Sequence, residues 1–190
     1  LSLGNLVWLD LDGDGTNQVT EPGISNVVVT LLSVSGGVTN PVAVQTQTTD
    51  ATGHYHFTNL FTGDYVVIIS NVPPATPRST TTITSTDGGA TAPDGVDNGG
   101  QPGGLGTAVY SPVITLVAGT EPTTDGDGAN DNQTVDFGLT PVYDLGDLPD
   151  TGAGTSAGNY QTLLSDAGPR HTLLEHLATA LSRVQGARQA

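Results

Sequence analysis

Short runs of β-branched and aromatic residues, separated by turn residues, follow one another over most of the chain. Val, Ile, Thr, Tyr and Phe dominate these runs, and they suit a pleated, half-buried surface. The runs predict strands over residues 3–9, 26–34, 43–49, 54–58, 64–70, 79–85, 111–117 and 133–139. Because no helical pattern lies between them, their spacing predicts an all-β, antiparallel sandwich.

Alternation within the runs predicts which side chains face the core. Tyr55 and Phe57 alternate with polar residues, so both are predicted to point inward. Val135 and Phe137 are predicted to point inward in the same way, with Asp136 between them pointing outward. These positions define the expected core face of two strands.

Turn residues and one apolar run predict how the strands connect. Residues 65–69 are apolar on both faces, which indicates a central strand. Turn residues at 50–53 and 62–63 predict two short hairpins. Residues 88–106 form a long Gly-, Asp- and Pro-rich loop, and a loop of that length is typical of a functional or a disordered segment.

The composition changes near position 141, which predicts a boundary. We expect a β-sandwich over 1–141, an Asp/Gly-rich extended segment over 142–171, and a short amphipathic helix and tail over 172–190. Thr172 and Glu175 fit a capping box, and leucines follow at helical spacing. The alternative is that this tail is a cloning or processing remnant.

Charge and composition exclude several classes of function. The chain carries 19 acidic and 4 basic residues, for a net charge of −15, and its basic residues are all arginines. Nothing in such a chain could neutralise a phosphate backbone, so nucleic acid is not an expected partner. It contains no cysteine, which excludes disulfides and thiolate metal sites. No apolar run is long enough for a membrane helix, so direct membrane insertion is not expected. The absence of any methionine predicts a processed product or a fragment of a longer protein.

One acidic stretch has the spacing of a calcium loop. Asp10, Asp12, Asp14 and Glu21 fit the pattern D-x-D-x-D-G-x-x-x-x-x-E of the twelve-residue EF-hand loop. Calcium prefers six to eight hard oxygen ligands, and the Thr16 carbonyl would supply another of them. The flanks differ from an EF-hand, because a strand pattern precedes the loop and Pro-Gly follows it. The sequence therefore predicts a Ca²⁺ loop between strands, with a solvated acidic turn as the alternative.

Two weaker acidic clusters are further candidates. Asp94 and Asp97 lie in the long loop, and Asp125, Asp127 and Asp131 precede the last predicted strand. Together they suggest that one calcium ion joins the two stretches and orders the long loop. The alternative is that each is an ordinary acidic turn. Carboxylates that crowd together repel one another, and the chain has no lysine to pair with them, which favours a bound cation over an ordinary turn.

The sequence contains no catalytic pattern, and we predict no enzymatic activity. No serine lies in a G-x-S-x-G elbow, and no Gly-rich stretch leads into Lys-Ser or Lys-Thr. His54 and His56 share one strand face, but they are expected to be solvent-exposed.

The order of motifs resembles the B-type repeats of serine-aspartate repeat (SdrD-like) surface adhesins. The resemblance covers roughly the first 140 residues and rests on five segments, at 3–15, 21–32, 48–57, 59–66 and 134–138. It implies a Greek-key, immunoglobulin-like (Cna-B-like) sandwich, with calcium ions that stiffen tandem modules on a cell surface. Asp10, Asp12, Asp14 and Glu21 fall on the main calcium loop of that family. Related domains often carry a Lys–Asn crosslink, which this lysine-free chain cannot form.

The favoured hypothesis is therefore a secreted or cell-surface module, stiffened by calcium, that acts as a rigid spacer or adhesive domain. Its partners would be neighbouring modules or subunits of the same surface structure. An alternative is a self-assembling fibre subunit, a homo-oligomer whose exposed first strand, extended segment and helix contact neighbours. A weaker alternative is an accessory module of a secreted hydrolase.

Overall fold

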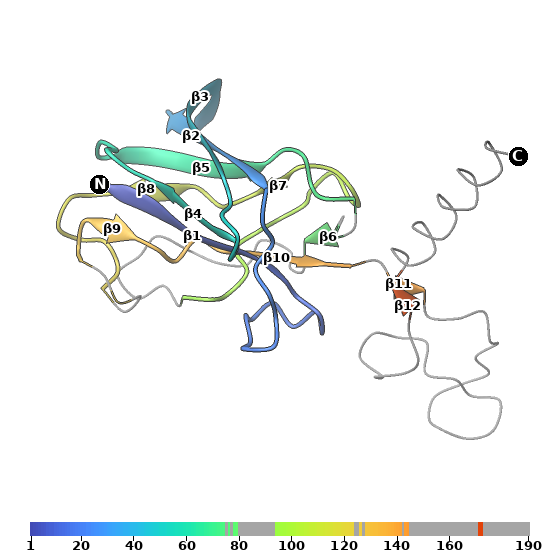
Figure 1. The fold of residues 1–190 in the computed structure, drawn as a ribbon. Coiled ribbons are helices and arrows are strands. Elements are labelled where there is room, and N and C mark those ends of the chain that lie inside the picture. Colours follow the sequence, from blue (N-terminus) through green and yellow to red (C-terminus); the bar gives the residue numbers. More distant parts are fainter. Residues whose placement is uncertain are drawn as a thin grey trace, which may run out of the picture. The chain divides into compact units, whose positions relative to one another are not determined.

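The computed structural model describes residues 1–74, 76, 78–79, 94–123, 126, 128–141, 143–144 and 171–172. The strands are β1 (Ser2–Leu9), β2 (Val28–Ser35), β3 (Val38–Thr48), β4 (His54–Phe57), β5 (Gly63–Ile69), β6 (Arg78–Ser79), β7 (Val109–Tyr110), β8 (Ile114–Leu116), β9 (Asp131–Asn132), β10 (Phe137–Thr140), β11 (Tyr143–Asp144) and β12 (His171–Thr172). The chain divides into two compact units, Leu1–Thr140 and Pro141–Ala190. Unit 1 holds two packed sheets (Figure 1).

The first sheet is built around β1. Its strand order is β4-β1-β10-β6, and β9 also pairs with β1. β4 runs antiparallel to β1, with Leu3 opposite Phe57. β10 runs parallel to β1, with Val7 opposite Phe137, and β9 is parallel to it as well. The expectation of a purely antiparallel sandwich is therefore corrected, because the first and last strands of unit 1 lie side by side in the same direction.

The position of β1 also corrects the expectation of an exposed first strand. β1 has hydrogen-bonded neighbours on both sides, β4 on one and β10 with β9 on the other. Its backbone groups are used within the sheet, so they offer no free edge to another chain.

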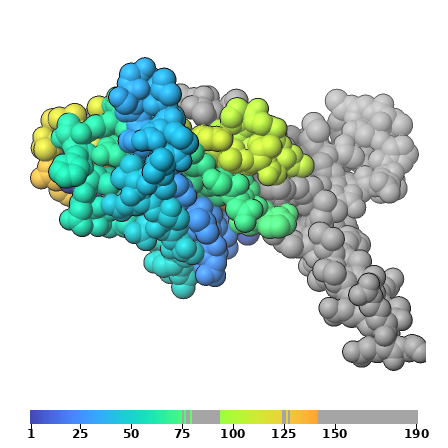
Figure 2. Space-filling model, turned by 90° about the horizontal axis from the view of Figure 1, so that it is seen from above, coloured from blue at the N-terminus to red at the C-terminus, as the bar shows by residue number. Residues whose placement is uncertain are grey.

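The second sheet has β5 at its centre, as the apolar run at 65–69 predicts. Its order is β3-β2-β5-β7, and β8 also pairs with β5. β2 and β3 form a hairpin through Gly36 and Gly37, whose φ angles of 59° and 78° suit a tight two-residue turn. Figures 1 and 2 show this hairpin standing out from the body of the sandwich, and Val38 and Val42 on β3 are 71% and 70% exposed.

The two hairpins expected at 50–53 and 62–63 are wrong. The first turn leads from β3 to β4 and the second from β4 to β5, and in both cases the two strands belong to different sheets. A turn sequence specifies a local change of direction, whereas the partner of the next strand depends on where its apolar face is buried.

The core lies between the sheets. Leu3, Val7, Phe57, Phe137 and Leu139 enter it from the first sheet and are fully buried. The second sheet contributes Val29, Leu31, Val67, Ile69, Val109, Ile114 and Leu116. Tyr55 packs edge-on against Phe57 and donates its hydroxyl proton to the carbonyl oxygen of Val135 at 2.6 Å. The inward positions predicted for Tyr55, Phe57, Val135 and Phe137 are confirmed.

Asp136, by contrast, was expected to point outward, and that expectation is wrong. The residue is completely buried. Alternation places its side chain on the far side of the strand from Phe137, but in the folded protein that side is occupied by other chain segments that supply hydrogen-bond donors. Alternation thus predicts the face of a strand, not whether that face meets solvent.

Little of unit 2 is described. β11 and β12 pair antiparallel, with Tyr143 opposite Thr172. The short helix expected within 172–190 is not supported, because Thr172 lies in β12 and residues 173–190 lie outside the described part of the chain. Among the residues that the structure describes, no helix has the length and apolarity needed to cross a lipid bilayer.

Candidate metal centre

The acidic loop of residues 10–21 leaves β1 and returns to it. At its start, the Asp10 amide donates to the Leu139 carbonyl of β10 at 3.1 Å. At its end, the Leu9 amide donates to the Pro22 carbonyl at 2.9 Å, and Gly23 forms a bridge with Trp8. The loop is thus closed at its base by the end of β1, and no helix flanks it, as Pro22-Gly23 predicted.

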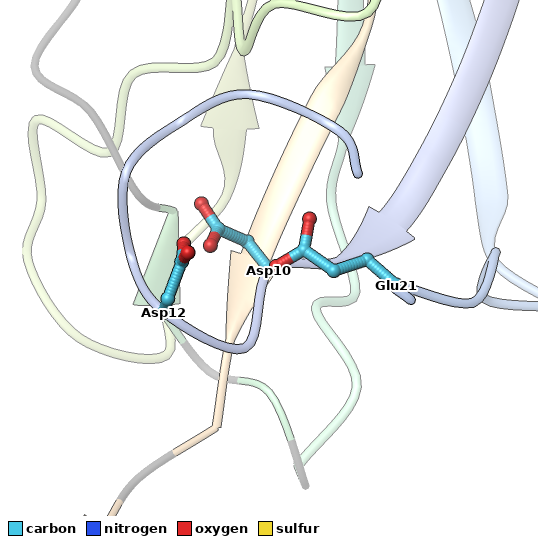
Figure 3. Close-up of side chains that lie close together, drawn as sticks. All are labelled: Asp10, Asp12 and Glu21. Carbon is cyan, nitrogen blue, oxygen red and sulfur yellow. The ribbon is translucent and has the colours of Figure 1, made fainter. Parts of the chain in front are cut away.

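Three carboxylates of this loop converge. Ligand atoms of Asp10, Asp12 and Glu21 all lie within 4.8 Å of one another (Figure 3). Asp10 is completely buried, Glu21 is 7% exposed and Asp12 faces solvent. Figure 3 shows Glu21 reaching toward Asp10 from the returning arm of the loop. No other group of three or more acidic or histidine residues converges in this way within the described ranges.

Backbone amides of the loop hold these carboxylates in place. The two oxygens of Asp10 accept from the amides of Gly13 and Gly15, at 2.6 and 2.9 Å. Glu21 Oε1 accepts from the Leu11 amide at 2.7 Å and Oε2 from the Gln18 amide at 3.2 Å. Gly15, the glycine of the D-x-D-x-D-G pattern, has a φ of 78°, a left-handed conformation that favours glycine and lets the loop turn sharply. These hydrogen bonds direct the Asp10 and Glu21 carboxylates toward the centre of the loop.

Asp14 and Thr16 are placed differently from the three converging residues. The Asp14 carboxylate is exposed and accepts from the Thr16 amide at 2.7 Å and from Gln18 Nε2 at 2.8 Å. Thr16 faces Val96 in an antiparallel bridge. The two hydrogen bonds of this bridge are made by the residues on either side of Thr16 and Val96, and not by Thr16 or Val96 themselves. In such a pair the facing residues direct their own N–H and C=O away from each other's strand. The bridge does not use the Thr16 carbonyl, which therefore stays a candidate ligand.

The donor set suits a hard cation. Calcium binds oxygen at about 2.3–2.6 Å, so two ligands of one ion lie at most about 5 Å apart. The spacing of the three carboxylates meets that limit. With no lysine anywhere in the sequence, three crowded carboxylates repel one another unless a cation or protons neutralise them. Asp10, Asp12 and Glu21 thus fit a calcium ion, and Asp14 and Thr16 are near enough in sequence to complete its shell.

The long loop brings Asp94 and Asp97 to a different place, beside β1 and β10. Asp97 is buried, and its Oδ1 accepts from the amides of Gly99 at 2.8 Å and Gly138 at 3.1 Å. Asp94 is exposed and accepts from Asn5 Nδ2 at 3.0 Å. Neither carboxylate belongs to the converging group of the acidic loop.

Asp131 lies at the other end of β1. Its Oδ1 contacts His56 Nε2 at 3.1 Å, and β9 places Asp131 opposite Ser2. Asp97 accepts from Gly138, and Gly138 is paired with Trp8. Trp8 lies six residues further along β1 than Ser2, which is a distance of roughly 20 Å. One ion cannot contact both Asp97 and Asp131 at that separation. Asp125 and Asp127 lie outside the described residues, so their role as ligands stays a prediction.

The pKa values of two acidic groups report their surroundings. Burial raises the pKa of Asp136 well above its usual value, and the nearby charge of Asp94 raises it further. Burial also opposes ionisation of Asp131, but hydrogen bonds from Ser2 and His56 outweigh it and lower the pKa of that carboxyl. The pKa values of Asp131 and Asp136 are therefore shifted in opposite directions, although both residues belong to the last part of unit 1.

Asp136 and Asn98 are buried structural residues of this region, a role that the sequence analysis did not predict for either of them. Asp136 accepts from the amides of Leu6 and Gly95, at 2.9 and 2.8 Å. Its own amide donates to Asn98 Oδ1 at 2.5 Å, and the Asn98 amide donates back to the Asp136 carbonyl at 2.9 Å. A buried Asp on the solvent-predicted face of a strand has no local signature, so nothing in the sequence pattern could have found it.

Comparison with known proteins agrees with this geometry. The SdrD B-like domain family matches residues 1–139. Serine-aspartate repeat-containing protein F of Staphylococcus epidermidis is 34% identical over 148 residues, which cover 77% of this chain and 8% of that protein. Serine-aspartate repeat-containing protein D of Staphylococcus aureus (strain Newman) is 34% identical over 147 residues, which cover 77% of this chain and 9% of that protein. The chain thus spans under a tenth of the length of these relatives. With two packed sheets, an acidic loop after the first strand and a match over nearly all of unit 1, the chain belongs to the SdrD B-like domain family.

Proposed function

We propose that this chain is a calcium-stabilised structural module of a cell-surface protein. The observation that carries the proposal is the convergence of Asp10, Asp12 and Glu21 within 4.8 Å in a loop closed by hydrogen bonds at its base. SdrD B-like domains are structural and not catalytic, and the relatives named above are serine-aspartate repeat-containing proteins much longer than this chain. As one module among the parts of such a protein, this chain would space and hold its neighbours.

The position of the loop explains how an ion would stiffen the module. Asp10 follows directly on β1, and its amide is bonded to Leu139 of β10. An ion bound by Asp10 would therefore hold together the end of the first strand and the end of the last strand of unit 1. Fraying of these two strand ends would then require loss of the ion, which links the rigidity of the module to calcium concentration.

Calcium binding is tested by isothermal titration calorimetry on the chelator-treated chain. We expect saturable binding, with a dissociation constant in the range that extracellular calcium modules show, about 10⁻⁴–10⁻³ M. Asp12→Asn removes one carboxylate charge from an exposed ligand and should weaken binding about tenfold. Magnesium serves as the control cation, because its small octahedral shell fits a loop of this kind poorly.

A flat titration with calcium would contradict the proposal, and so would an Asp12→Asn variant with unchanged affinity. Binding of equal strength for magnesium would show that the loop is a general acidic turn that attracts cations without a defined shell.

We further propose that the partners are neighbouring modules of the same surface structure and that the chain works as a secreted protein. Self-assembly into a fibre is less well supported, because β1 lies inside a sheet and offers no free edge. Light scattering after size exclusion, with and without calcium, separates the two cases. A mass that stays that of one chain over a hundredfold range of concentration supports the module, and growth of large species with concentration supports the fibre.

A further inference from the structure

A short segment distant in sequence is bonded to the acidic loop. Residues 94–98, here called the clamp segment, lie beside residues 15–17 and form a two-bonded bridge with them. The Asp97 amide donates to the Gly15 carbonyl at 2.8 Å, and the Asn17 amide donates to the Gly95 carbonyl at 2.8 Å. Thr16 and Val96 face each other between these bonds. The candidate calcium loop is thus supported by a second piece of chain.

The clamp segment is also bonded to the sheet behind it. Asp97 pairs in parallel with Asp136, and Asn98 exchanges two hydrogen bonds with Asp136, through its own amide and its Oδ1. The Gly95 amide donates to Asp136 Oδ2 at 2.8 Å. Asp97 and Asn98 are 4% and 2% exposed, so these bonds are shielded from water. The segment therefore connects the acidic loop to the strand residues next to β10.

We propose that the clamp segment is a positioning element of the calcium site and that its docking is coupled to ion binding. The inference rests on the proposed function, because it assumes that calcium binds the acidic loop. It states which segment holds the seventh residue of that loop in place for the ion. Thr16 occupies that position, and the bonds on either side of it fix its peptide groups relative to the clamp segment. The bridge leaves the Thr16 carbonyl unused, as a backbone ligand requires.

Gly15 is the residue that transmits the coupling. Its amide donates to Asp10 Oδ2 at 2.9 Å, and its carbonyl accepts from the Asp97 amide at 2.8 Å. One peptide on each side of Gly15 therefore joins a carboxylate of the ion site to the clamp segment. Without an ion, repulsion among the carboxylates favours opening of the loop, and a displaced Gly15 no longer holds Asp97. Binding then orders both pieces together.

Coupling of this kind is reciprocal, and reciprocity gives the test. Asn98→Ala removes the acceptor for the Asp136 amide on the side of the clamp segment that faces away from the loop. We expect it to weaken calcium binding about tenfold in calorimetry, within the range usual for coupled sites. The matched control is Ser111→Ala, which removes another buried side chain that accepts from a backbone amide, that of Val67 at 2.9 Å in the second sheet. The control should destabilise the fold and leave the calcium affinity unchanged.

Hydrogen–deuterium exchange on the unaltered 190-residue chain supplies a second measurement that needs no variant. Saturating calcium should slow exchange of the Asp97 and Asn98 amides at least tenfold more than it slows the amides of β5. Equal protection of both regions would overturn the inference, as would unchanged affinity in Asn98→Ala. Failure of calcium to bind the unaltered chain would overturn the proposed function, whereas binding without these two effects would overturn the coupling and leave the function intact.

Discussion

Two groups of carboxylates lie at the same end of β1, and the fold treats them in opposite ways. In the acidic loop, Asp10, Asp12 and Glu21 turn toward one another and are held by amides of their own loop. At the clamp segment, Asp97 and its neighbour Asp136 turn toward amides from distant parts of the chain, those of Gly138 and Leu6 among them. The first arrangement leaves converging oxygens for a cation, and the second uses its oxygens to join strands.

The comparison shows that an aspartate's role depends on the direction of its donors. A carboxylate that accepts from neighbours in its own loop costs little to hold and can still turn toward an ion. A buried carboxylate that accepts from separate strands substitutes for missing ladder bonds, and removing it leaves buried amides unsatisfied. Asp97 and Asp12 have the same side chain, yet we expect only Asp97 to matter in the absence of calcium.

The largest effect should come from Asp97→Ala. The change leaves the buried amides of Gly99 and Gly138 without this acceptor, at about 1–3 kcal/mol each, so we expect a loss of about 3 kcal/mol in the free energy of unfolding. Urea unfolding in calcium and in chelator measures it, and the loss should be present in both. A loss confined to calcium would mean that the hydrogen bonds of Asp97 form only when the ion is bound, and it would remove the distinction between the two groups.

Removal of calcium should have the next largest effect. An ion that binds only the folded state stabilises it by about 2.7 kcal/mol at a hundredfold excess over its dissociation constant. Thermal unfolding of the unaltered chain should therefore shift down by several degrees in chelator. Asp12→Asn is the control, since its melting temperature should depend much less on calcium. Identical melting curves with and without chelator would mean that the loop is not a metal site.

Asp94→Asn should stabilise the protein slightly in chelator at neutral pH. Burial, and then the charge of Asp94, hold the folded pKa of Asp136 above its unfolded value. The stability that Asp136 contributes is thus complete below the unfolded pKa and is lost as pH rises through the folded pKa. Removal of the neighbouring charge lowers that folded pKa and reduces the loss, by about 0.5 kcal/mol after allowance for the exposure of Asp94. Urea unfolding at pH 4.5 and 7.5 measures the gain, which should appear only at the higher pH.

The smallest effect should come from His56→Gln. The pair between His56 and Asp131 is partly exposed, with 46% of the His56 side chain and 21% of the Asp131 side chain accessible, and exposed pairs contribute about 0.2–1 kcal/mol. The folded pKa of Asp131 is lowered, so its contribution exists above the unfolded pKa and is lost as pH falls through the folded pKa. Loss of His56 should move the pKa of Asp131 upward in an NMR titration, while calcium affinity stays unchanged. A change in calcium affinity would place Asp131 in a metal site after all.

Much of the fold follows from local pattern. The strands at residues 2–9, 54–57 and 63–69 lie where β-branched runs and alternation predict them, and the central place of β5 follows from its two apolar faces. The acidic loop was predictable for a similar reason, because its ligands and its glycine at position 15 are spaced within one short stretch. A pattern that is complete within a dozen residues can be recognised without knowledge of the rest of the chain.

Only the tertiary structure decided which strands became neighbours and which polar residues became buried. β1 pairs in parallel with β10, and Asp136 is enclosed by Leu6 of β1 and by Gly95 and Asn98 of the clamp segment, two parts of the sequence that are both distant from it. Each of these contacts joins residues at least 38 positions apart. Local sequence sets the face on which a side chain lies, but whether that face meets water or another segment depends on the packing of the whole chain.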